Sequence, residues 1–348
     1  MRVDTNVPLN DWRAVAAAAK AAEAAGFDGL MSAEIANDPF LPLAFAAVAT
    51  QRIELSTGIC VAFPRSPMVV AETSWDLHAQ SGGRFRLGLG SQVKGHNERR
   101  FSVPWSAPVP RLREYVESLR AIWRCWEKQE PLRYEGEHYR FTLMTPEFSP
   151  PPSGLPAIPV SIAAVGPDML KMAGRVCDGV RLHGFATRKY LEEVALPQIQ
   201  AGLAQGGRPR ANFEIWGGGF VLSGVDDAAV AKQLEFGRYR VAFYGSTRSY
   251  HGVLAVHGWE DLGGELHAMS KRGQWNEMAK RVPDEVVRTF AAVGRYDEIA
   301  GLIAERFGGV TDTVTIGVDG KQDPGLMREI VQDVKRIPCA FEAYAGNW

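Results

Sequence analysis

Residues 159–184 read PVSIAAVGPDMLKMAGRVCDGVRLHG, and the fold class of the chain can be inferred from this segment. Its first part, 159–165, is a short apolar run typical of a buried strand, and 178–184 is a second run of the same kind. Between them, 167–176 has the length and the opening proline of a helix. Two strands joined by a helix make a βαβ unit, in which the strands run parallel and the helix covers the sheet.

The same alternation of strand and helix runs through the whole chain. The expected strands are 3–6, 27–32, 53–63, 84–91, 159–165, 178–184, 213–222 and 311–318. Eight βα units in a chain of 348 residues favour a closed (β/α)8 barrel, a TIM barrel of the α/β class, over an open doubly wound sheet. We therefore predict a single barrel domain that covers residues 1–348.

Two segments interrupt the repeat and are predicted to be insertions in loops of the barrel. Residues 129–158, after strand four, are rich in Pro, Tyr and Phe and are typical of a hairpin followed by an extended arm. Residues 245–283, after strand seven, have the pattern of extra helices. Loops that follow the strands of such a barrel build its active-site face, so we expect the second insertion to act as a lid.

Composition and charge exclude several classes of function. The chain has 39 Lys and Arg against 40 Asp and Glu, a net charge of −1, which lacks the basic footprint of a nucleic-acid-binding protein. It has no run of about 18 apolar residues, so no membrane span is predicted. The opening MRVDTNVPLNDW contains acidic residues where an export signal needs an apolar core, and we expect a cytoplasmic location.

The four cysteines do not predict a metal site or a disulfide framework. They lie at positions 60, 125, 177 and 339, with no C-x-x-C pair and no clustered histidines. Reduced, structural thiols are the simplest interpretation, and no metal is expected.

Polar side chains at the ends of strands are the candidates for chemistry, because these ends form the mouth of the barrel. Glu34 follows strand two and is a candidate general base, an acceptor for a cofactor ring, or a solvated carboxylate. His183 ends strand six and is either catalytic or supporting, and His96 lies in the polar loop after strand four. Glycines beside small residues end three of the strands, which suits close approach by a flat ring and its phosphate tail. Neither a G-x-S-x-G nucleophile elbow nor an H-E-x-x-H metal motif occurs.

Eight segments, in matching order and spacing, carry a resemblance to a known family. Five of them are AAGFDGLMSAE (24–34), IELSTGICVAFPRSPMVVA (53–71), SGGRFRLGLGSQ (81–92), RLREYVESLRAIW (111–123) and residues 159–180. These resemble the bacterial-luciferase-like superfamily. Three more are similar to its branch that uses the deazaflavin coenzyme F420, namely DPFLPLAFAA (38–47), QVKGHNERRF (92–101) and residues 257–275.

This resemblance implies a barrel with a flavin or deazaflavin ring in its C-terminal mouth. It implies a non-prolyl cis peptide behind the ring at the end of strand three, between Gly58 and Ile59. Glu34 falls where relatives place an acidic residue that faces the ring. The positions that match the family's cofactor contacts are Gly90, Ser91 and Gln92 after strand four, and Val165, Gly166 and Pro167 after strand five.

Two departures from the family pattern bear on the chemistry. Several relatives have a catalytic histidine directly after the acidic residue, where this chain has Ile35, so that His96 or His183 is left to supply any proton transfer. The luciferases place an arginine for the FMN phosphate where this chain has Ser91, which favours F420 over FMN.

The resemblance therefore predicts an oxidoreductase that transfers a hydride between F420 and a small organic substrate. The alternative is an FMN-dependent monooxygenase that takes reduced flavin from a separate reductase and reacts with oxygen. A non-catalytic flavin-binding barrel stays open because of Ile35. Relatives are commonly dimers, so we expect a homodimer. Aromatic residues near the mouth suit an apolar or ring-bearing substrate, and these are Phe63, Trp105, Phe185 and Trp216.

Overall fold

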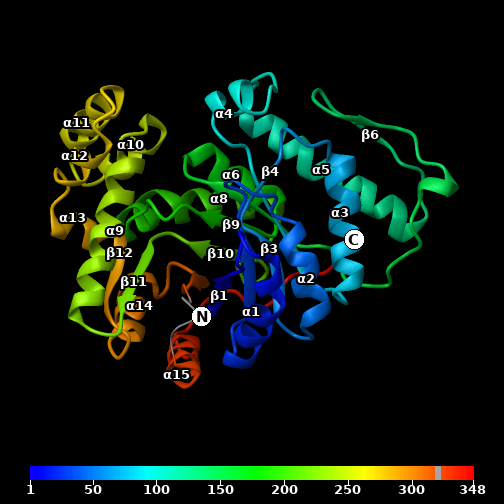
Figure 1. Ribbon diagram of the computed structural model, residues 1–348. Helices are drawn as coiled ribbons and strands as arrows, with labels where there is room; N and C mark the ends of the chain where they lie inside the picture. Colours follow the sequence, from blue (N-terminus) through cyan, green and yellow to red (C-terminus); the bar gives the residue numbers. More distant parts are fainter. Residues whose placement is uncertain (318–322) are drawn as a thin grey trace.

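The computed structural model describes residues 1–317 and 323–348 and shows a closed parallel barrel (Figure 1). The strands pair in the order β3-β2-β1-β13-β10-β9-β8-β5, and β5 pairs with β3 to close the circle. They are β1 (Arg2–Asn6), β2 (Gly29–Ser32), β3 (Glu54–Thr57), β5 (Phe85–Gly90), β8 (Val160–Ala164), β9 (Gly179–Leu182), β10 (Glu214–Gly217) and β13 (Thr313–Thr315). The predicted (β/α)8 barrel is confirmed, because each of the eight predicted strands contributes one of these.

Helices connect the strands and cover the outside of the barrel. They are α1 (Trp12–Ala25), α2 (Leu41–Ala49), α3 (Pro67–Gln80), α5 (Pro108–Lys128), α6 (Pro167–Val176), α7 (Arg188–Tyr190) with the π-helical turn η2 (Leu191–Ala195) and α8 (Leu196–Gly206), α14 (Ile299–Phe307) and α15 (Pro324–Lys335). The alanine-rich α1 shows why they form where they do. The Asp11 side chain accepts a hydrogen bond from the Arg13 N–H at its start, and Gly26 ends it with a φ of 88°.

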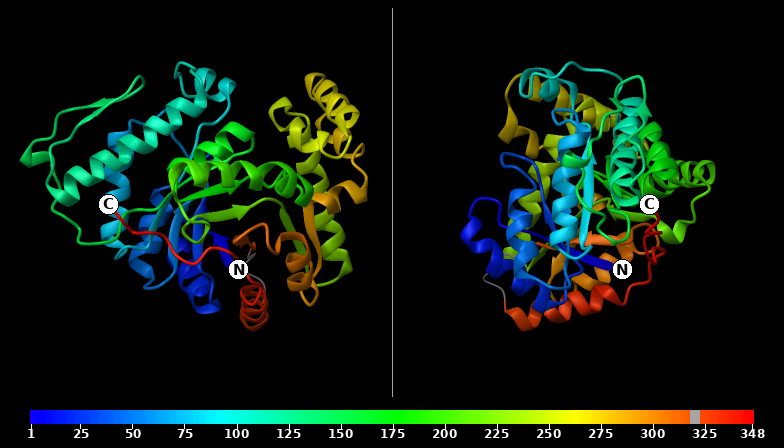
Figure 2. Two further views of the ribbon diagram at one scale, coloured as in Figure 1. Left: turned by 180° about the vertical axis from the view of Figure 1, so that it is seen from behind. Right: turned by 90° about the vertical axis from the view of Figure 1, so that its right-hand side faces the viewer.

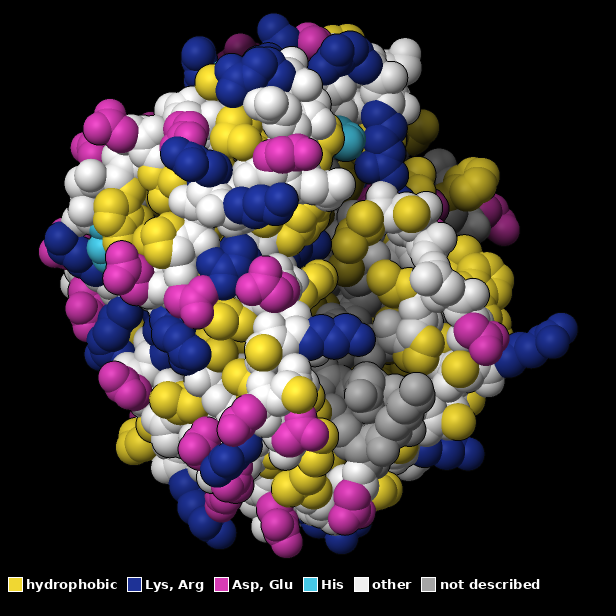
Figure 3. All heavy atoms as spheres, turned by 60° about the vertical axis from the view of Figure 1, so that its left-hand side comes forward, with side chains coloured by type: hydrophobic (Ala, Val, Ile, Leu, Met, Phe, Trp, Pro, Cys, Tyr) yellow, Lys and Arg dark blue, Asp and Glu magenta, His cyan; other side chains and the backbone are white. Residues whose placement is uncertain are grey.

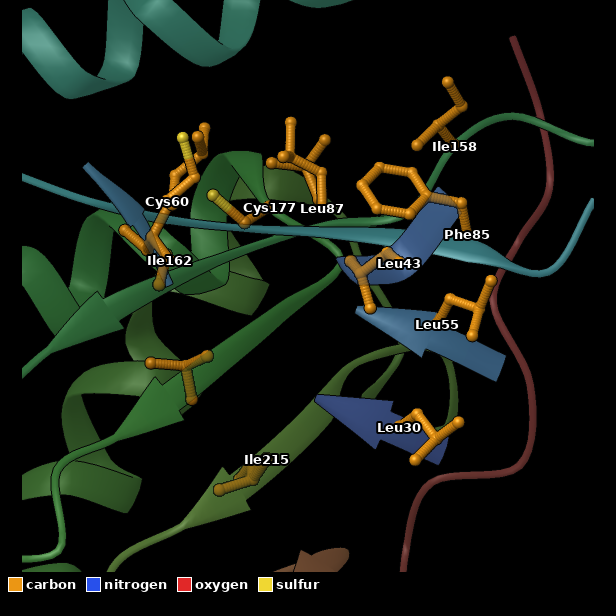
Figure 4. Close-up of a cluster of buried hydrophobic side chains, with 14 of the residues drawn as sticks. Leu30, Leu43, Leu55, Cys60, Phe85, Leu87, Ile158, Ile162, Cys177 and Ile215 are labelled. Atoms are coloured by element: carbon orange, nitrogen blue, oxygen red, sulfur yellow. The ribbon is translucent and has the colours of Figure 1, made fainter. Parts of the chain in front are cut away.

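The main core lies between the barrel and these helices. Alternate residues of each strand point outward, and Figure 4 shows such side chains from β2, β3, β5, β8 and β10. The four cysteines are free, and Cys60 and Cys177 belong to this core (Figure 4). Over the two described ranges, no helix has both the length and the apolar character that crossing a membrane requires.

The predicted strand 53–63 is divided in two. β3 ends at Thr57, and a second short strand, β4 (Cys60–Val61), pairs with the end of β5. The peptide bond between Gly58 and Ile59 is cis, at the position that the family resemblance implied.

The insertion after β5 contains the predicted hairpin. Strands β6 (Tyr134–Glu135) and β7 (Arg140–Phe141) pair antiparallel, and the 3-10 turn η1 (Pro146–Phe148) follows in the extended arm. The buried carboxylate of Glu114 on α5 accepts hydrogen bonds from the backbone N–H groups of Glu137 (3.2 Å) and His138 (2.7 Å). This carboxylate therefore ties the hairpin to the outer helix.

The predicted seventh strand, 213–222, is wrong in its second half. β10 ends at Gly217, and the chain turns through Gly217 and Gly218, whose φ values are 73° and 91°. Such positive φ values are open to glycine and strained for other residues, so three consecutive glycines end the barrel strand here. The apolar run that follows leaves the barrel as β11 (Phe220–Gly224) and pairs in parallel with β12 (Ala291–Arg295).

Residues 220–295 form one insertion, longer than the predicted 245–283. Between β11 and β12 it holds α9 (Asp227–Gly245), the 3-10 turn η4 (Arg248–Tyr250), α10 (His251–Ala255), α11 (Glu260–Lys271), α12 (Trp275–Ala279) and α13 (Asp284–Phe290). Its apolar side chains build a second core together with Phe185 and Tyr190, separate from the barrel core. Figure 2 shows this insertion and the hairpin arm on opposite flanks of the barrel.

Candidate active site

The ends of the barrel strands bring the predicted site residues to one end of the molecule. Because the eight strands run parallel, the loops after β2, β3, β5, β8 and β9 open at the same mouth. The short helix α4 (Lys94–Arg99) and helices α10 to α12 of the insertion lie at one end in every view, and α15 lies at the other (Figures 1 and 2). The mouth is thus flanked by α4 and by the insertion.

The loop after β3 and the end of β5 form a tight floor at this mouth. The Ala62 N–H donates to the carbonyl of Gly90 over 2.9 Å. A Cβ on Gly58 would overlap the sulfur of Met31, and a Cβ on Gly90 would lie 2.7 Å from Cδ1 of Ile59. Glycine at these two positions therefore lets the backbone pack closely against Met31 and Ile59.

Glu34 lies at the mouth, but its carboxylate is already bound within the protein. Oε2 accepts a hydrogen bond from the Val61 N–H over 2.7 Å and lies 2.8 Å from Nη1 of Arg65. Nη2 of Arg65 continues the network to Asp38 at 3.1 Å. With 7% of its side chain exposed, Glu34 holds the loop after β3 in place. Arg65 was not predicted, because no sequence pattern marks it as the partner of a carboxylate 31 residues earlier.

The loop after β5 is ordered by a buried asparagine that sequence reasoning also missed. Nδ2 of Asn97 donates to the carbonyl oxygens of Ser91 (2.9 Å) and Val93 (3.2 Å). Gln92 has a φ of 55°, and its Oε1 accepts from the Val93 N–H over 2.9 Å. Ser91 and Gln92, the predicted cofactor contacts, therefore sit in a defined loop directly after Gly90.

The polar loop predicted around His96 is a helix instead. The chain turns at Val93 into α4, and the His96 N–H bonds to the Val93 carbonyl over 3.1 Å. The side chain of His96 is exposed on this helix. It is brought to the mouth but is not part of its floor.

The predicted phosphate loop leads into α6 with an open helix start. Gly166 is the N-cap residue and has no side-chain cap, and a Cβ placed on it would meet nothing within 4 Å among the described residues. Pro167 begins the helix, and the Tyr190 hydroxyl donates to the Val165 carbonyl over 2.6 Å and so fixes the turn. Backbone N–H groups at such a helix start favour an anion.

His183 at the end of β9 is a neutral imidazole. Burial, with a smaller contribution from the charge of Arg240, lowers its pKa to about 4. Its Nδ1 accepts a hydrogen bond from the Phe185 N–H over 2.9 Å, so the single proton of the neutral ring is on Nε2. His183 is therefore a hydrogen-bond donor at neutral pH and not a source of a proton.

A chain of aromatic rings connects His183 to the surface of the insertion. Its ring lies 4.2 Å from that of Tyr244, which lies 5.3 Å from Phe243, which lies 5.9 Å from Trp275 (centroid distances). Tyr250 flanks His183 at 4.9 Å. Phe243 and Trp275 are 40% and 42% exposed, so this row, which we call the aromatic chain, runs from solvent to the mouth.

Most of the aromatic residues predicted to contact the substrate are buried away from the mouth. Phe63 is buried in the main core, Trp216 is buried inside the barrel against Arg86 and Arg181, and Phe185 is buried in the core of the insertion. Trp105 is partly exposed before α5. The aromatic chain was missed, because its members are dispersed over a predicted lid without a spacing that marks one face.

Charged side chains fill the inside of the barrel, which sequence reasoning did not anticipate. Arg86 on β5 reaches across to Asp4 on β1 (3.1 Å), Glu54 on β3 (2.8 Å) and Glu214 on β10 (3.4 Å). Burial raises the pKa of Glu214, and the charges of Arg86 and Arg2 oppose that rise. The signal was available in the strand FRLGLG, where a cation alternates with outward apolar residues.

The described residues fit a flat, phosphate-bearing cofactor. Gly58 and Gly90 keep the loops of the mouth closely packed without a side chain of their own, and α6 offers an open helix start for a phosphate. Sequence reasoning placed Gly58, Ile59, Gly90, Ser91, Gln92, Val165, Gly166 and Pro167 here. Gly90 ends β5, Pro167 begins α6, and the others lie on the loops of this mouth. Whether they contact a cofactor stays a prediction.

About nine tenths of the chain is similar in sequence to known proteins. Residues 1–313 match the model of the luciferase-like monooxygenase family. An uncharacterised protein of Mycobacterium tuberculosis is 47% identical over 90% of this chain and 92% of its own. The 5,10-methylenetetrahydromethanopterin reductase of Archaeoglobus fulgidus is 31% identical over 91% of this chain and 94% of its own.

Solved structures share the fold. The coenzyme F420-dependent tetrahydromethanopterin reductase of Methanopyrus kandleri superposes with a TM-score of 0.77 at 21% identity, covering 97% of this chain and 99% of that one. A long-chain alkane monooxygenase superposes with a TM-score of 0.68 at 15% identity, covering 100% of this chain and 93% of that one.

Proposed function

Because the chain belongs to the luciferase-like family of F420-dependent oxidoreductases and flavin monooxygenases, we propose that it transfers a hydride between coenzyme F420 and a small organic substrate. The observation that carries this proposal is the floor formed by Gly58, Ile59 and Gly90 beside an open helix start. Ser91 supports F420 over FMN, since the luciferases have an arginine for the FMN phosphate at that place.

The residues of the mouth divide the work of binding. When bound, F420 supplies a ring carbon that accepts or gives the hydride. Gly58 and Gly90 let the backbone approach one face of the ring, and the N–H groups at the start of α6 hold a phosphate of the tail. Glu34 acts indirectly, because its bonds to Val61 and Arg65 fix the loop on which the ring rests.

The substrate enters from the side of the insertion. The aromatic chain offers apolar ring faces, so a ring-bearing or apolar substrate packs there and excludes water from the reacting carbon. The Nε2–H of His183 donates a hydrogen bond to a substrate oxygen and polarises it. Any proton exchanged with solvent passes through His96, which is exposed on α4.

A second candidate is an FMN-dependent monooxygenase supplied with reduced flavin by a separate reductase. The similarity of fold to an alkane monooxygenase favours it. The FMN ring would rest on the same glycine floor that is proposed for F420. The two candidates differ in whether the reduced cofactor reacts productively with O2, because a deazaflavin has carbon where flavin has N5. Membership in this family of enzymes removes the support for a non-catalytic barrel.

We also propose a cytoplasmic homodimer. Four free cysteines suit a reducing compartment. Trp12, Leu41, Phe45 and Val48 on α1 and α2 are 43% to 76% exposed, and an apolar surface of this kind suits a second copy of the chain. On the face shown in Figure 3, basic and acidic side chains are interspersed, which does not suit nucleic acid.

Titration of the purified protein with F420 and with FMN, followed by tryptophan fluorescence, tests the proposal. Submicromolar binding of F420 with FMN at least tenfold weaker supports hydride transfer with F420. The opposite preference supports the monooxygenase. Absence of binding for both cofactors contradicts both candidates.

A further inference from the structure

Arg181 crosses the inside of the barrel just below the mouth. It extends from β9 past β8, where its Nε donates to Ser161 Oγ over 3.0 Å, to β2, where its Nη1 lies 3.3 Å from the sulfur of Met31. Its guanidinium lies over the ring of Trp216, 4.4 Å from the centroid. The residue is 6% exposed, so the cation is buried.

This cation lacks the partners that the neighbouring arginine has. Arg86 is within 3.4 Å of three carboxylates, whereas Arg181 forms no ion pair with any described residue. Its Nη2 is buried and has no hydrogen-bond partner in the described ranges. Burial lowers the pKa of Arg181 to about 10, and the charge of Arg86 acts in the same direction, so the group stays charged at neutral pH.

The guanidinium lies directly against the floor of the mouth. A Cβ built on Gly58 would lie 3.4 Å from Nη1 of Arg181, and one built on Gly88 would lie 2.5 Å from its Nε. These contacts place the cation on the barrel side of the segment whose other side is the proposed ring floor. Cation–π stacking on Trp216 explains why the group stays in place but leaves Nη2 unpaired. A buried donor without a partner is costly, and this one belongs to a cation that lies beside the floor of the mouth.

We propose that Arg181 is a fixed positive charge beneath the cofactor ring that stabilises its reduced, anionic form; this inference rests on the proposed function. When the ring accepts a hydride, a substrate C–H bond breaks and a ring C–H bond forms with both electrons. The ring is reduced, the substrate is oxidised, and any hydroxyl proton of the substrate goes to water. The ring therefore gains one negative charge, and a cation held in a dry interior favours that state.

The inference predicts a difference in affinity between the two redox states. Wild-type protein should bind reduced F420 at least tenfold more tightly than oxidised F420. In Arg181→Met this ratio should fall at least tenfold while the affinity for oxidised F420 changes less than threefold. A tenfold change in the ratio corresponds to a shift of about 30 mV in the midpoint potential of the bound two-electron couple. Arg181→Lys, which keeps the charge, should retain most of the ratio.

Arg306→Met is the matched control. Arg306 is also a buried arginine with donors, its Nε and Nη1, that are unpaired among the described residues, and burial also lowers its pKa to about 10. Its Nη2 donates to the carbonyls of Ala186 and Gly218 instead of reaching the floor. Its removal should leave the ratio unchanged. Circular dichroism shows whether each variant is folded. The ratio of the affinities of the wild-type protein for reduced and oxidised F420 tests the inference even if a variant does not fold.

The outcomes separate the inference from the proposed function. If F420 binds but the wild type prefers the oxidised form, or if Arg181→Met and Arg306→Met change the ratio equally, the inference is wrong and the proposed function stands. If F420 does not bind and FMN does, the same ratio is measured with oxidised and reduced FMN, and the same two results overturn the inference. If neither cofactor binds, both fail.

Discussion

The inside of the barrel and the insertion 220–295 differ in the polarity of their buried side chains. The barrel interior carries buried charges on four strands, among them Asp4, Arg86, Arg181 and Glu214. In the insertion, by contrast, Ser246 is the single buried polar residue, and the core is aliphatic and aromatic. The first region supplies fixed charge and close backbone, and the second supplies apolar surface.

This difference indicates how the two regions share the work. Charge and backbone N–H groups suit a cofactor ring and its phosphates, which are the same in every turnover. Aromatic surface on an insertion suits the substrate, which differs between members of a fold. We therefore propose that the cofactor binds in the barrel and the substrate binds against the insertion.

The largest expected effect comes from breaking the charge network of the barrel. Arg86→Met leaves the buried Asp4 without an ion-pair partner among the described residues and leaves Glu214 with Arg2 alone, so it should lower the free energy of unfolding by about 3–5 kcal/mol. Urea denaturation measures this. The control is Arg124→Met, which removes an exposed pair with Glu130 and should cost less than about 1 kcal/mol. Equal losses of unfolding free energy in the two variants would show that the interior ion pairs do not stabilise the barrel more than an exposed pair does.

The elements that could be predicted from the sequence are those whose residues carry a local hydrophobic pattern of their own. The barrel was predictable because each βα unit has its own apolar run and its own glycine or proline boundary. β11 was not, because its apolar run Phe220–Leu222 differs from a barrel strand only in what it pairs with. The same holds for Arg86 and Glu214, which meet across a separation of 128 residues.

The site was predictable in place but not in its contacts. Glu34, Gly58, Gly90 and Gly166 lie at the mouth because they follow strands, and strand ends can be found from the pattern. Their partners come from other loops, and no single-sequence signal links Glu34 to Arg65. Neither the neutral state of His183 nor its edge-on contact with Tyr244 could be inferred without knowing how the insertion packs against β9.

The second-largest expected effect is a pH dependence of stability that comes from His183, which lies between the barrel and the insertion. Because the pKa of His183 falls from 6.5 to about 4 in the folded protein, the unfolded chain binds a proton between these values that the native state does not. His183 should therefore reduce stability as pH falls below about 6.5, by about 2 kcal/mol between pH 7 and pH 5.

His183→Gln provides the comparison, because it cannot titrate in this range. Urea denaturation at pH 7 and pH 5 should show that the wild type loses about 2 kcal/mol more than the variant. If both proteins lose the same stability, His183 is accessible to a proton and its environment is not the apolar one described.

A smaller effect should follow from loosening the floor of the mouth. Glu34→Gln keeps the shape but removes the charge that binds Arg65 and the Val61 N–H, so it should cost about 1.5 kcal/mol of stability. Thermal and urea unfolding measure this. Glu135→Gln, which affects an exposed pair with Arg140, should stay within about 0.5 kcal/mol of wild type. No loss in Glu34→Gln would mean that the carboxylate is free to act on a ligand.

The division between barrel and insertion is tested most directly by F420 affinity in one variant from each region. Ser91→Arg, in the loop after β5, crowds the tail of the cofactor and should weaken F420 binding at least tenfold. Tyr244→Leu, in the aromatic chain, should leave F420 affinity within twofold of wild type. If Tyr244→Leu instead weakens F420 at least tenfold and Ser91→Arg does not, the cofactor lies against the insertion and the assignment is wrong.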